Sequence, residues 1–398
     1  MKFIKHTCSS IFLLSFLFFS CAKEVKKVDT IPLKTTKGMF PVMESFANNL
    51  PKLSTNYINS KKNEIERFYQ KNWPNNTMNG GFLVAKNGQI ICEKYNGIAN
   101  NQSQTIISST TPIHIASVSK VLTATAVLKL IDAKKIDLNQ KVNTILQGFP
   151  FPEITIKTLL DHRSGIRNYA YFTNDKKVWD NHKIMTNQDV LNIMINNKIE
   201  LEFPTDTRFS YSNTNYAMLA LVIEKITGLD YKLAMKKIIF EPLHMDNTFV
   251  FDYEKDKDTA TPSYKGNFVK IPMDFLDGIY GDKNIYSTPR DLLKLDLARR
   301  VPGFLNPELE KAVYTGYSNE HKGTKNYGLG IRMIEWETGE SFYFHNGWWH
   351  GNTSSYVSMG KEHVTIISLS NKFTHATYKV RNLAVLFGDY PFKIQDSL

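Results

Sequence analysis

The sequence predicts an α+β fold: an antiparallel sheet built from both chain ends, with flanking helices and an inserted, mainly helical subdomain. Strand patterns occur at 81–95 and return at 327–369, whereas helical patterns and loops fill the stretch between them. Pairing the early strands with the late ones gives one sheet that can bury its apolar faces under helices. We expect the inserted helical subdomain to span about residues 135–285.

Strands are expected where short apolar runs flank a turn signal. Gly81–Lys86 and Gln89–Tyr95 lie on either side of Asn87-Gly88, a dipeptide that favours the tight turn of a β-hairpin. Near the C-terminus, one predicted pair flanks Thr338-Gly339 and another flanks Gly360. The four strands predicted there are Tyr327–Glu335, Ser341–His345, Ser354–Met359 and His363–Leu369.

Helices are expected in the middle of the chain and at its end. Val118–Asp132 is almost wholly apolar, which is typical of a helix buried on all sides. Asn215–Ile226 fits a second helix that Gly228 ends, and Thr288 before a proline is a typical N-cap for a third. A closing helix is expected over about 378–387.

The composition excludes several classes of protein. Of the 398 residues, 42% are hydrophobic and 12% aromatic, which is too apolar for an intrinsically disordered chain. Three cysteines cannot build a disulfide scaffold. The formal net charge is +11, but no stretch combines dense lysine and arginine with interleaved aromatic residues. We therefore interpret the charge as solvated and expect no nucleic-acid partner.

The N-terminus is predicted to be an export signal. An early positive charge and the apolar run Ile11–Phe19 precede a small residue and Cys21, the pattern of a secretory signal peptide. The run is shorter than the ~20 residues of a permanent transmembrane helix. The cysteine at the cut resembles a bacterial lipobox. We expect residues 1–21 to be a signal peptide, Cys21 to carry a lipid and residues 22–44 to form a tether. The chain would then be an exported lipoprotein anchored to a membrane of the bacterial cell envelope, in the periplasm or at the outer membrane. The alternative is a plain signal peptide with an incidental cysteine.

The pattern Ser117-x-x-Lys120 carries the first sign of chemistry. Residues three apart share a helix face, so Lys120 would lie beside the Ser117 hydroxyl at the start of a buried helix. A serine hydroxyl is a poor nucleophile until a base takes its proton, and burial disfavours the charged form of lysine. The same spacing begins at Ser20 and Ser358, but neither opens a buried helix. We predict that Ser117 is a nucleophile and Lys120 its base.

A second pattern, Tyr211-x-Asn213, stands on a predicted loop before a helix. The two side chains can face one cleft, where the phenol can transfer protons and the amide can orient Lys120 and a substrate carbonyl. Residues 317–319 repeat the tripeptide Tyr-Ser-Asn, but no helix follows them. We therefore predict that Tyr211 is the third catalytic residue and that Asn213 binds substrate.

A third pattern, His345-Asn346-Gly347-Trp348, ends a predicted strand. A strand edge beside the serine can offer a backbone N–H to an oxyanion, and such fixed donors are often the largest catalytic contribution. We assign the oxyanion hole to the N–H groups of Ser117 and Trp348. His345 is expected to supply positive or hydrogen-bonding character at the wall of the cleft, and Gly347 and Trp348 to contact substrate.

In this order, the three patterns resemble those of the serine β-lactamase and penicillin-binding protein superfamily. Within it, the chain is similar to the branch of class C β-lactamases, D-Ala-D-Ala carboxypeptidases and related esterases. The resemblance covers about residues 45–393, for which it implies a β-lactamase-like fold. Four further stretches match that branch: 83–88, 159–165, 281–288 and 327–330.

The resemblance implies a serine hydrolase that forms an acyl-enzyme on a peptide, β-lactam or ester carbonyl, as a peptidase or hydrolase of the cell envelope. Its partners would be such a small substrate and, through the N-terminal lipid, a membrane. It implies no metal and no cofactor. The alternatives are a small-ester esterase on the same fold and a non-catalytic ligand-binding lipoprotein on this scaffold.

Three departures from the family pattern qualify these expectations. His345 stands where the family often has a lysine that recognises a substrate carboxylate, and histidine is only partly charged at neutral pH. The aromatic residues that follow Gly347 predict a narrow cleft suited to small, flat acyl groups. No separate carboxylate for deacylation is recognised, so Tyr211 with Lys120 would have to activate water.

Overall fold

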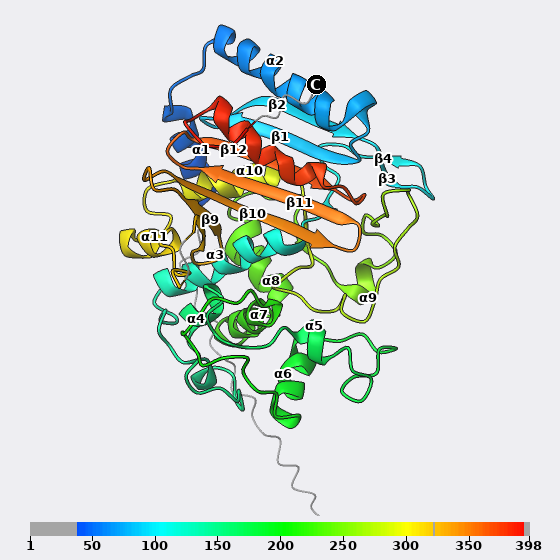
Figure 1. Ribbon diagram of the computed structural model, residues 1–398, viewed down its shortest axis with the longest axis vertical. Helices are drawn as coiled ribbons and strands as arrows, with labels where there is room; N and C mark the ends of the chain where they lie inside the picture. Colours follow the sequence, from blue (N-terminus) through cyan, green and yellow to red (C-terminus); the bar gives the residue numbers. More distant parts are fainter. Residues whose placement is uncertain (1–37, 321–322, 394–398) are drawn as a thin grey trace, which may run out of the picture. The chain divides into compact units, whose positions relative to one another are not determined.

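Among the residues that the structure describes, 38–320 and 323–393 of a computed structural model, seven strands form one antiparallel sheet (Figure 1). Their order is β2-β1-β12-β11-β10-β9-β8. The strands are β1 (Gly80–Lys86), β2 (Gln89–Asn96), β8 (Lys325–Tyr327), β9 (Arg332–Glu335), β10 (Ser341–Trp349), β11 (Asn352–Met359) and β12 (Val364–Ser370). The pairing of β1 with β12 joins the two ends of the chain and confirms the predicted sheet.

The helices lie before the sheet, between its halves and at its end. They are α1 (Met39–Asn49), α2 (Thr55–Asn72), α3 (Ser119–Asp132), α4 (Ile156–Leu160), α5 (Tyr169–Phe172), α6 (Asn187–Asn196), α7 (Asn213–Thr227), α8 (Tyr231–Met235), α9 (Tyr253–Asp256), α10 (Pro289–Arg299) and α11 (Pro307–Val313). Short 3-10 turns are η1 (Pro74–Asn76), η2 (Ala116–Val118) and η3 (Val142–Thr144); η4 (Lys236–Phe240) is a π-helical turn, and η5 (Ala376–Leu386) is a longer 3-10 helix. Two small sheets pair β3 (Ile98–Asn100) with β4 (Thr105–Ile106), and β5 (Ile113–His114) with β7 (Ile285–Ser287), which also pairs β6 (Phe249–Val250).

Alternating side chains divide the apolar residues of the sheet between two cores. Phe82 and Val84 of β1 pack with α2 and η5, whereas Leu83 and Ala85 belong to a larger core with α3, α7 and α10. Figure 1 accordingly shows α2 and η5 on one side of the sheet and α3 on the other. Helix α3 therefore lies against the sheet and helix α7, where it can present Ser117 beside β10.

The predicted helices are confirmed with small changes at their ends. Helix α7 begins at Asn213, two residues earlier than expected, and ends at Gly228, whose φ of 68° is left-handed. The Thr288 side chain accepts a hydrogen bond from the Asp291 N–H at 3.2 Å, so Thr288 is the N-cap of α10. The closing element is the 3-10 helix η5 rather than an α-helix over 378–387.

The single strand predicted over Tyr327–Glu335 is wrong, because β8 and β9 are separate strands joined by a tight turn. Gly330 in this turn has a φ of +85°, and a Cβ there would lie 2.2 Å from the Cβ of Ala124 on α3. Only glycine permits both the turn and this close approach. The turn folds Arg332 back toward the centre of the sheet.

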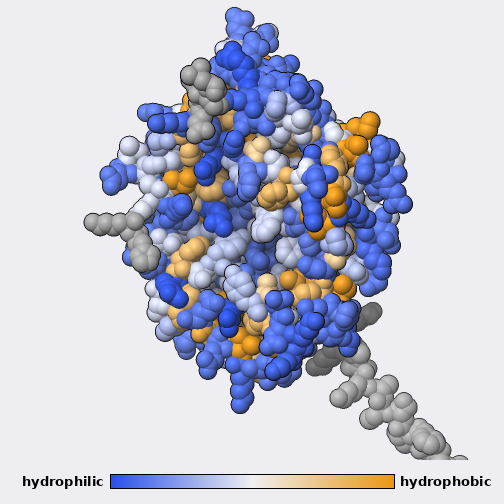
Figure 2. Space-filling model, turned by 45° about the vertical axis from the view of Figure 1, so that its right-hand side comes forward, coloured by the Kyte–Doolittle hydropathy of each residue, from blue (hydrophilic) through white to orange (hydrophobic). Residues whose placement is uncertain are grey.

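The described residues contain no helix long and apolar enough to cross a membrane. The predicted signal peptide and Cys21 lie outside the described residues, as does all of the predicted tether before residue 38. On the face drawn in Figure 2, hydrophilic residues predominate and apolar residues lie in small, separate groups.

Candidate active site

Ser117 lies in the turn η2, which connects β5 to α3. It lies two residues before the start of α3, so the expected position at the helix terminus is correct only to within that turn. From Ile113 to Leu128 it is the one residue that is not buried. The preceding Ala116 has a φ of +49°, a left-handed conformation that costs a residue with a Cβ about 1–2 kcal/mol. The strained turn brings the hydroxyl of Ser117 out of an otherwise buried segment.

Lys120 is fully buried, and its amine faces Ser117. Its Nζ donates to the Ser117 Oγ at 3.1 Å and to the main-chain carbonyl of Asp282 at 2.8 Å. The carbonyl fixes the amine while leaving it in hydrogen-bond distance of the serine. The same 3.1 Å separation would let an unprotonated amine accept the hydroxyl proton instead, as an activating base does.

Tyr211 and Asn213 border the same space from the start of α7. Asn213 is the first residue of the helix, not a loop residue as expected. The Lys120 Nζ lies 5.0 Å from the centre of the Tyr211 ring. Among the described residues, the buried Tyr211 hydroxyl and Asn213 Oδ1 have no hydrogen-bond partner within the protein. Polar atoms buried in this way are available to a ligand.

His162 positions Tyr211 and was not predicted as a site residue. Its Nδ1 accepts from the Ser212 N–H at 3.2 Å and from the Asn215 side-chain amide at 3.1 Å, so its proton is on Nε2. Its ring centre lies 4.3 Å from that of Tyr211. Burial, with Lys120 nearby, lowers the pKa of His162 well below its ordinary value, so the ring is neutral. Sequence analysis had noted residues 159–165 only as a supporting stretch.

Gly347 of β10 touches the turn that holds the serine. A Cβ at this position would lie 2.8 Å from the backbone nitrogen of Ser117 and 2.5 Å from the carbonyl oxygen of Ile115. The glycine therefore lets the β10 backbone approach the backbone of Ser117 closely, which the predicted oxyanion hole requires. The next residue, Trp348, is the predicted second donor.

We expect Gly347→Ala to lower kcat about 10²–10³-fold, because the new methyl group must push β10 away from Ser117. Steady-state kinetics with an activated ester measures the loss. Gly360→Ala is the matched control, since Gly360 also lies in the C-terminal strand region, has no positive φ and has no atom within 4 Å of an added Cβ. Equal activity of Gly347→Ala and wild type would contradict the assignment of the oxyanion hole.

His345 does not carry the positive charge that the sequence analysis gave as one of two possibilities. It is fully buried, and burial beside Arg332 and Lys120 lowers its pKa well below the ordinary value. Its Nδ1 donates to the carbonyl of Asn346 at 2.9 Å, so Nε2 accepts from the Tyr327 hydroxyl at 3.2 Å. Of the two expected characters, positive or hydrogen-bonding, the structure therefore favours hydrogen bonding, because the ring is neutral and both of its nitrogens are engaged.

Arg332 supplies the cation instead, and sequence analysis missed it. Its guanidinium lies 4.6 Å from the centre of the Tyr211 ring and 5.9 Å from that of Tyr327. In the sheet, Arg332 pairs with Phe344, the neighbour of His345. The sequence feature that could have indicated Arg332 is the turn after Tyr327. This turn leads into β9, which pairs with β10 and so brings residue 332 beside the third motif.

Trp348 and Trp349 differ in burial. The Trp348 side chain is 63% exposed, and its Nε1 donates to the carbonyl of His350 at 2.9 Å. Trp349 is partly buried, and its Nε1 donates to Asp277 at 2.7 Å. The narrow cleft and the substrate contact of Trp348 stay predictions.

Within the described residues, one group could present three ligand atoms to a metal ion: Asp274, Asp277 and His350. The Asp277 carboxylate already accepts from the Trp349 indole, from His350 Nε2 and from the Asp274 N–H at 2.6 Å. These bonds account for the cluster as an ion pair and a turn, so no metal chemistry is assigned to it.

The folding stability of the protein depends on pH through His114, which lies three residues before Ser117. The Nδ1 of buried His114 accepts from the Ala116 N–H at 3.1 Å, so its Nε2 donates to Asn284 Oδ1 at 3.0 Å. Burial lowers the pKa of His114 from 6.5 to about 4. Below pH 6.5 the unfolded chain binds a proton that the folded chain rejects. Stability is thus present above pH 6.5 and is lost as the pH falls toward 4.

We expect the urea midpoint to fall as the pH is lowered from 6.5 to 4, and His114→Gln to flatten part of this fall. Each such group contributes a slope of up to about 1.4 kcal/mol per pH unit. Urea unfolding at several pH values measures it. His182→Gln, at an exposed histidine, should retain the wild-type slope. A slope unchanged by His114→Gln would contradict the expectation.

The sheet, the serine turn and the buried lysine together define a serine hydrolase of the β-lactamase and penicillin-binding type. The sequence model of the Beta-lactamase family matches residues 69–388, so the chain belongs to this family. It is 27% identical over 362 residues to penicillin-binding protein 4* of Bacillus subtilis, covering 85% of this chain and 78% of that protein. It is 23% identical over 337 residues to teichoic acid D-alanine hydrolase of Staphylococcus aureus, covering 82% and 81%.

The fold agrees with that of solved structures. The crystal structure of penicillin binding protein from Bacillus halodurans superimposes with a TM-score of 0.70 at 23% sequence identity, covering 81% of this chain and 99% of that one. This likeness confirms the predicted β-lactamase-like fold.

Proposed function

We propose that the protein cleaves a peptide, lactam or ester carbonyl through an acyl-enzyme on Ser117. The observation that carries this proposal is the 3.1 Å contact between Lys120 Nζ and Ser117 Oγ. The Lys120 amine, in its unprotonated form, takes the hydroxyl proton as the serine oxygen attacks the carbonyl carbon. The backbone N–H groups of Ser117 and Trp348 hold the oxyanion. The proton is then returned to the leaving group as the acyl-enzyme forms.

Tyr211 is the proposed proton carrier between these groups. Lys120 and Arg332 both lie over its ring, and its hydroxyl has no partner within the described protein. Asn213, with an unpartnered oxygen beside it, would orient the substrate amide. In deacylation, Tyr211 with Lys120 would activate water, and the ester of Ser117 would return to the hydroxyl.

The proposed substrate class follows from Arg332, whose guanidinium lies beside the Tyr211 ring. The Arg332 guanidinium can pair with a carboxylate on the leaving-group side, as neutral His345 cannot. A peptide or lactam that bears a carboxylate is therefore favoured over an uncharged ester. A small-ester esterase is the second candidate, supported by the name of one relative, teichoic acid D-alanine hydrolase. A non-catalytic binding scaffold is disfavoured by the intact Ser117–Lys120 contact.

Arg332→Met is expected to raise KM about 10–100-fold for substrates with a carboxylate, because a charge-assisted hydrogen bond is lost. The kcat/KM for an uncharged ester should change less than about threefold. Steady-state kinetics on both substrates measures the difference. Arg332→Lys, which keeps the charge without the two-pronged geometry, should lie between. Equal losses on both substrates would assign Arg332 to the structure of the site instead.

The cellular setting is proposed from sequence alone. We propose that the chain is exported and tethered to the cell envelope through a lipid on Cys21. The apolar run Ile11–Phe19 before that cysteine supports this. Metabolic labelling with a fatty-acid probe tests it: Cys21→Ala should lose the label and leave the membrane fraction. A labelled Cys21→Ala protein would overturn it.

The experiment that tests the reaction is intact-mass analysis of the protein with a fluorophosphonate, with benzylpenicillin and with a small p-nitrophenyl ester. We expect one adduct per chain, which peptide mapping assigns to Ser117. A persistent penicillin adduct would mean slow deacylation at a penicillin-binding type of site. Reaction with only the ester and the fluorophosphonate would favour the esterase. No adduct on the folded protein would overturn catalysis at Ser117.

A further inference from the structure

A patch of exposed apolar side chains and lysines lies beside the end of β10. Trp348 is 63% exposed and Val269 is 50% exposed, although most large apolar residues of the described chain are buried. The ring centre of Phe373 lies 6.4 Å from that of Trp348, and Phe268 directly precedes Val269 in the chain. We define the basic aromatic patch by these residues: Lys265, Phe268, Val269, Trp348, Lys372 and Phe373. Of the residues proposed for the reaction, Trp348 alone belongs to it.

Main-chain hydrogen bonds hold the separate parts of the patch together. The Tyr264 N–H donates to the carbonyl of Asn371 at 2.8 Å, and the Phe373 N–H donates to the carbonyl of Tyr264 at 3.0 Å. The loop that follows Tyr264 therefore runs beside the end of the chain segment that leaves β12. The Lys372 Nζ lies 4.3 Å from the centre of the Phe268 ring. The patch is thus one continuous surface that the backbone keeps in place.

The loop presents its apolar side chains from a strained turn. The Phe268 N–H donates to the carbonyl of Lys265 at 2.9 Å, and the Lys265 N–H donates to the carbonyl of Val269 at 2.8 Å. Phe268 has a φ of 65°, which is left-handed and uncommon for a bulky residue. Folding alone would favour glycine or asparagine at this position. An aromatic residue held there at a cost in strain favours a role in binding.

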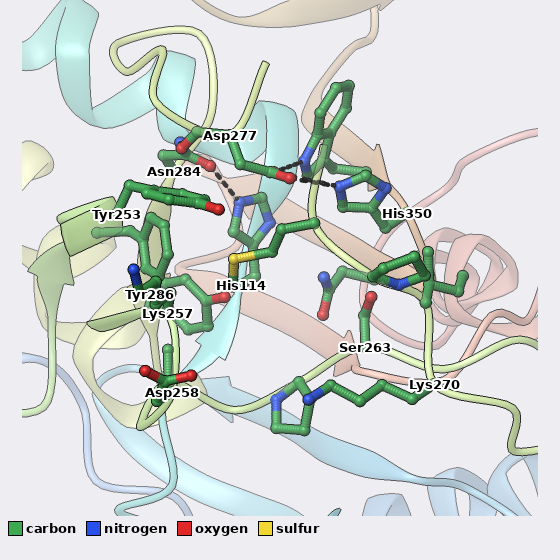
Figure 3. Close-up of a pocket in the computed structure, with 18 of the residues that line it drawn as sticks. His114, Tyr253, Lys257, Asp258, Ser263, Lys270, Asp277, Asn284, Tyr286 and His350 are labelled. Carbon is green, nitrogen blue, oxygen red and sulfur yellow. Dashed lines mark hydrogen bonds and ion pairs between the residues drawn. The ribbon is translucent and has the colours of Figure 1, made fainter. Parts of the chain in front are cut away.

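The charge around the patch is positive. No acidic residue occurs in the three segments that surround and supply it, 259–273, 341–361 and 363–388. Within the part of the chain that the structure describes, neither Lys265 nor Lys372 forms an ion pair. Figure 3 shows a further lysine, Lys270, at the edge of the neighbouring cavity of about 470 Å³. The patch therefore offers unpaired positive charge beside exposed apolar rings.

Anionic lipid surfaces bind this combination of side chains. Tryptophan is enriched at the level of the lipid headgroups, where its amphipathic ring is favoured. Other exposed apolar residues insert beside it, and negatively charged headgroups attract lysines. A soluble polyanion would be held by the lysines and would leave Val269 and Trp348 in water. The exposed apolar residues therefore favour a lipid surface over a soluble polyanion as the partner.

We propose that the basic aromatic patch docks on a membrane surface that carries anionic lipids. Trp348 and Val269 enter the headgroup region, and the lysines pair with lipid phosphates. Because Gly347 touches the Ser117 backbone, docking holds the reacting serine close to the lipid surface.

The lipid proposed on Cys21 would favour docking, and this step alone rests on the proposed cellular setting. Fully extended, residues 22–37 span at most about 55 Å. A lipid at Cys21 would thus keep the patch at a high effective concentration near the membrane.

Tryptophan fluorescence on vesicles tests the docking. Residues 1–37 contain no tryptophan, so contact of the N-terminus with lipid does not contribute to the signal. The full chain is mixed with an excess of phosphatidylcholine vesicles, with or without phosphatidylglycerol, whose acyl chains carry bromine, a quencher of nearby indole rings. We expect strong quenching only where phosphatidylglycerol is present. Trp348→Phe should remove most of the quenching.

Variants of the patch separate its charge from its apolar side chains. Each lysine near an anionic surface is worth about fivefold in binding, so Lys265→Gln with Lys372→Gln should shift the docking equilibrium about 25-fold. Val269→Ser and Phe268→Asn should each reduce the quenching as well. Asparagine tolerates the left-handed conformation at position 268, so the turn is retained.

Two matched controls lie elsewhere on the surface. Lys237→Gln removes an exposed lysine, and Val42→Ser changes a valine that is 49% exposed, close to the value for Val269. Both should leave the quenching unchanged. Hydrolysis of a small ester in solution should be the same in the controls and in the variants at 265, 268, 269 and 372, which shows that all are folded.

Each other outcome would overturn the proposal while the reaction at Ser117 is assessed separately with the ester. These outcomes are no quenching on either vesicle, quenching that is equal with and without phosphatidylglycerol, and quenching that persists in Trp348→Phe. Loss in the lysine double variant without loss in Val269→Ser and Phe268→Asn would assign the patch to a polyanion held by charge alone, and would also overturn docking on lipid.

Discussion

A chain with Ser117→Ala is expected to lose hydrolysis by about 10³-fold or more while remaining folded. The reason is that, among the described residues, Ser117 is the hydroxyl to which the Lys120 amine is hydrogen-bonded, at 3.1 Å, whereas its other hydrogen bond is to a main-chain carbonyl. Removing a nucleophile removes the whole covalent route, and what remains is binding and the oxyanion hole. Steady-state turnover of an activated ester measures the loss.

Stability should change little in the same variant. The hydroxyl is partly exposed and makes one recorded hydrogen bond, so the free energy of unfolding should change by about 1 kcal/mol or less. Thermal unfolding therefore distinguishes lost chemistry from lost structure. Ser358→Ala is the matched control, because Ser358 also begins a Ser-x-x-Lys pattern but lies on β11. An active Ser117→Ala chain, or an inactive Ser358→Ala chain, would contradict the assignment.

The parts of the site that were predictable depend on local geometry. Ser117 and Lys120 are three residues apart where a helical turn leads into a helix. Side chains with this spacing lie on the same face of any helix, so the contact can be predicted locally. The hairpin at Asn87-Gly88 and the cap at Thr288 are local for the same reason. Such features need no knowledge of the rest of the chain.

The missed parts depend on contacts between distant segments. Arg332 reaches Tyr211 only because β9 turns back along β10, and the strand predicted over Tyr327–Glu335 concealed that turn. The charge of His345 depends on complete burial and on two neighbouring cations, neither of which a motif records. A cavity of about 470 Å³ beyond Trp349 likewise combines segments that are far apart in the sequence, from Asn100 to Asn352.

The positioning of Lys120 shows how these long-range contacts serve the reaction. The Asp282 carbonyl that holds the amine comes from the segment just before β7. The Asp282 carboxylate accepts from the Tyr169 hydroxyl at 2.7 Å, and Lys283 donates to the same hydroxyl at 3.0 Å. The buried hydrogen bonds of Asp282 and Lys283 to Tyr169 therefore hold the Asp282 main chain in place, and its carbonyl positions the Lys120 amine. The family motif names the lysine but not the residues that aim it.

Lys120→Met and Lys120→Arg together test whether the lysine acts as a base or only as a charge. Both should lower the acylation rate by about 10³-fold, because methionine has no basic atom and arginine keeps its proton. Stopped-flow measurement of the first turnover, with benzylpenicillin or an activated ester, reports acylation directly. A fluorophosphonate should also react far more slowly, since the serine loses its activation.

The two variants differ in what they do to the fold. Methionine replaces a buried polar amine by an apolar chain of similar length, so Lys120→Met should fold with little loss of stability. Arginine must fit a larger group between Ser117 and the Asp282 carbonyl, so Lys120→Arg should be the less stable variant. If arginine restored the rate, positive charge alone would suffice and Lys120 would be an electrostatic residue. If both variants are folded and inactive, the reaction requires proton transfer through the Lys120 amine, because neither a positive charge nor an apolar chain of similar length replaces it.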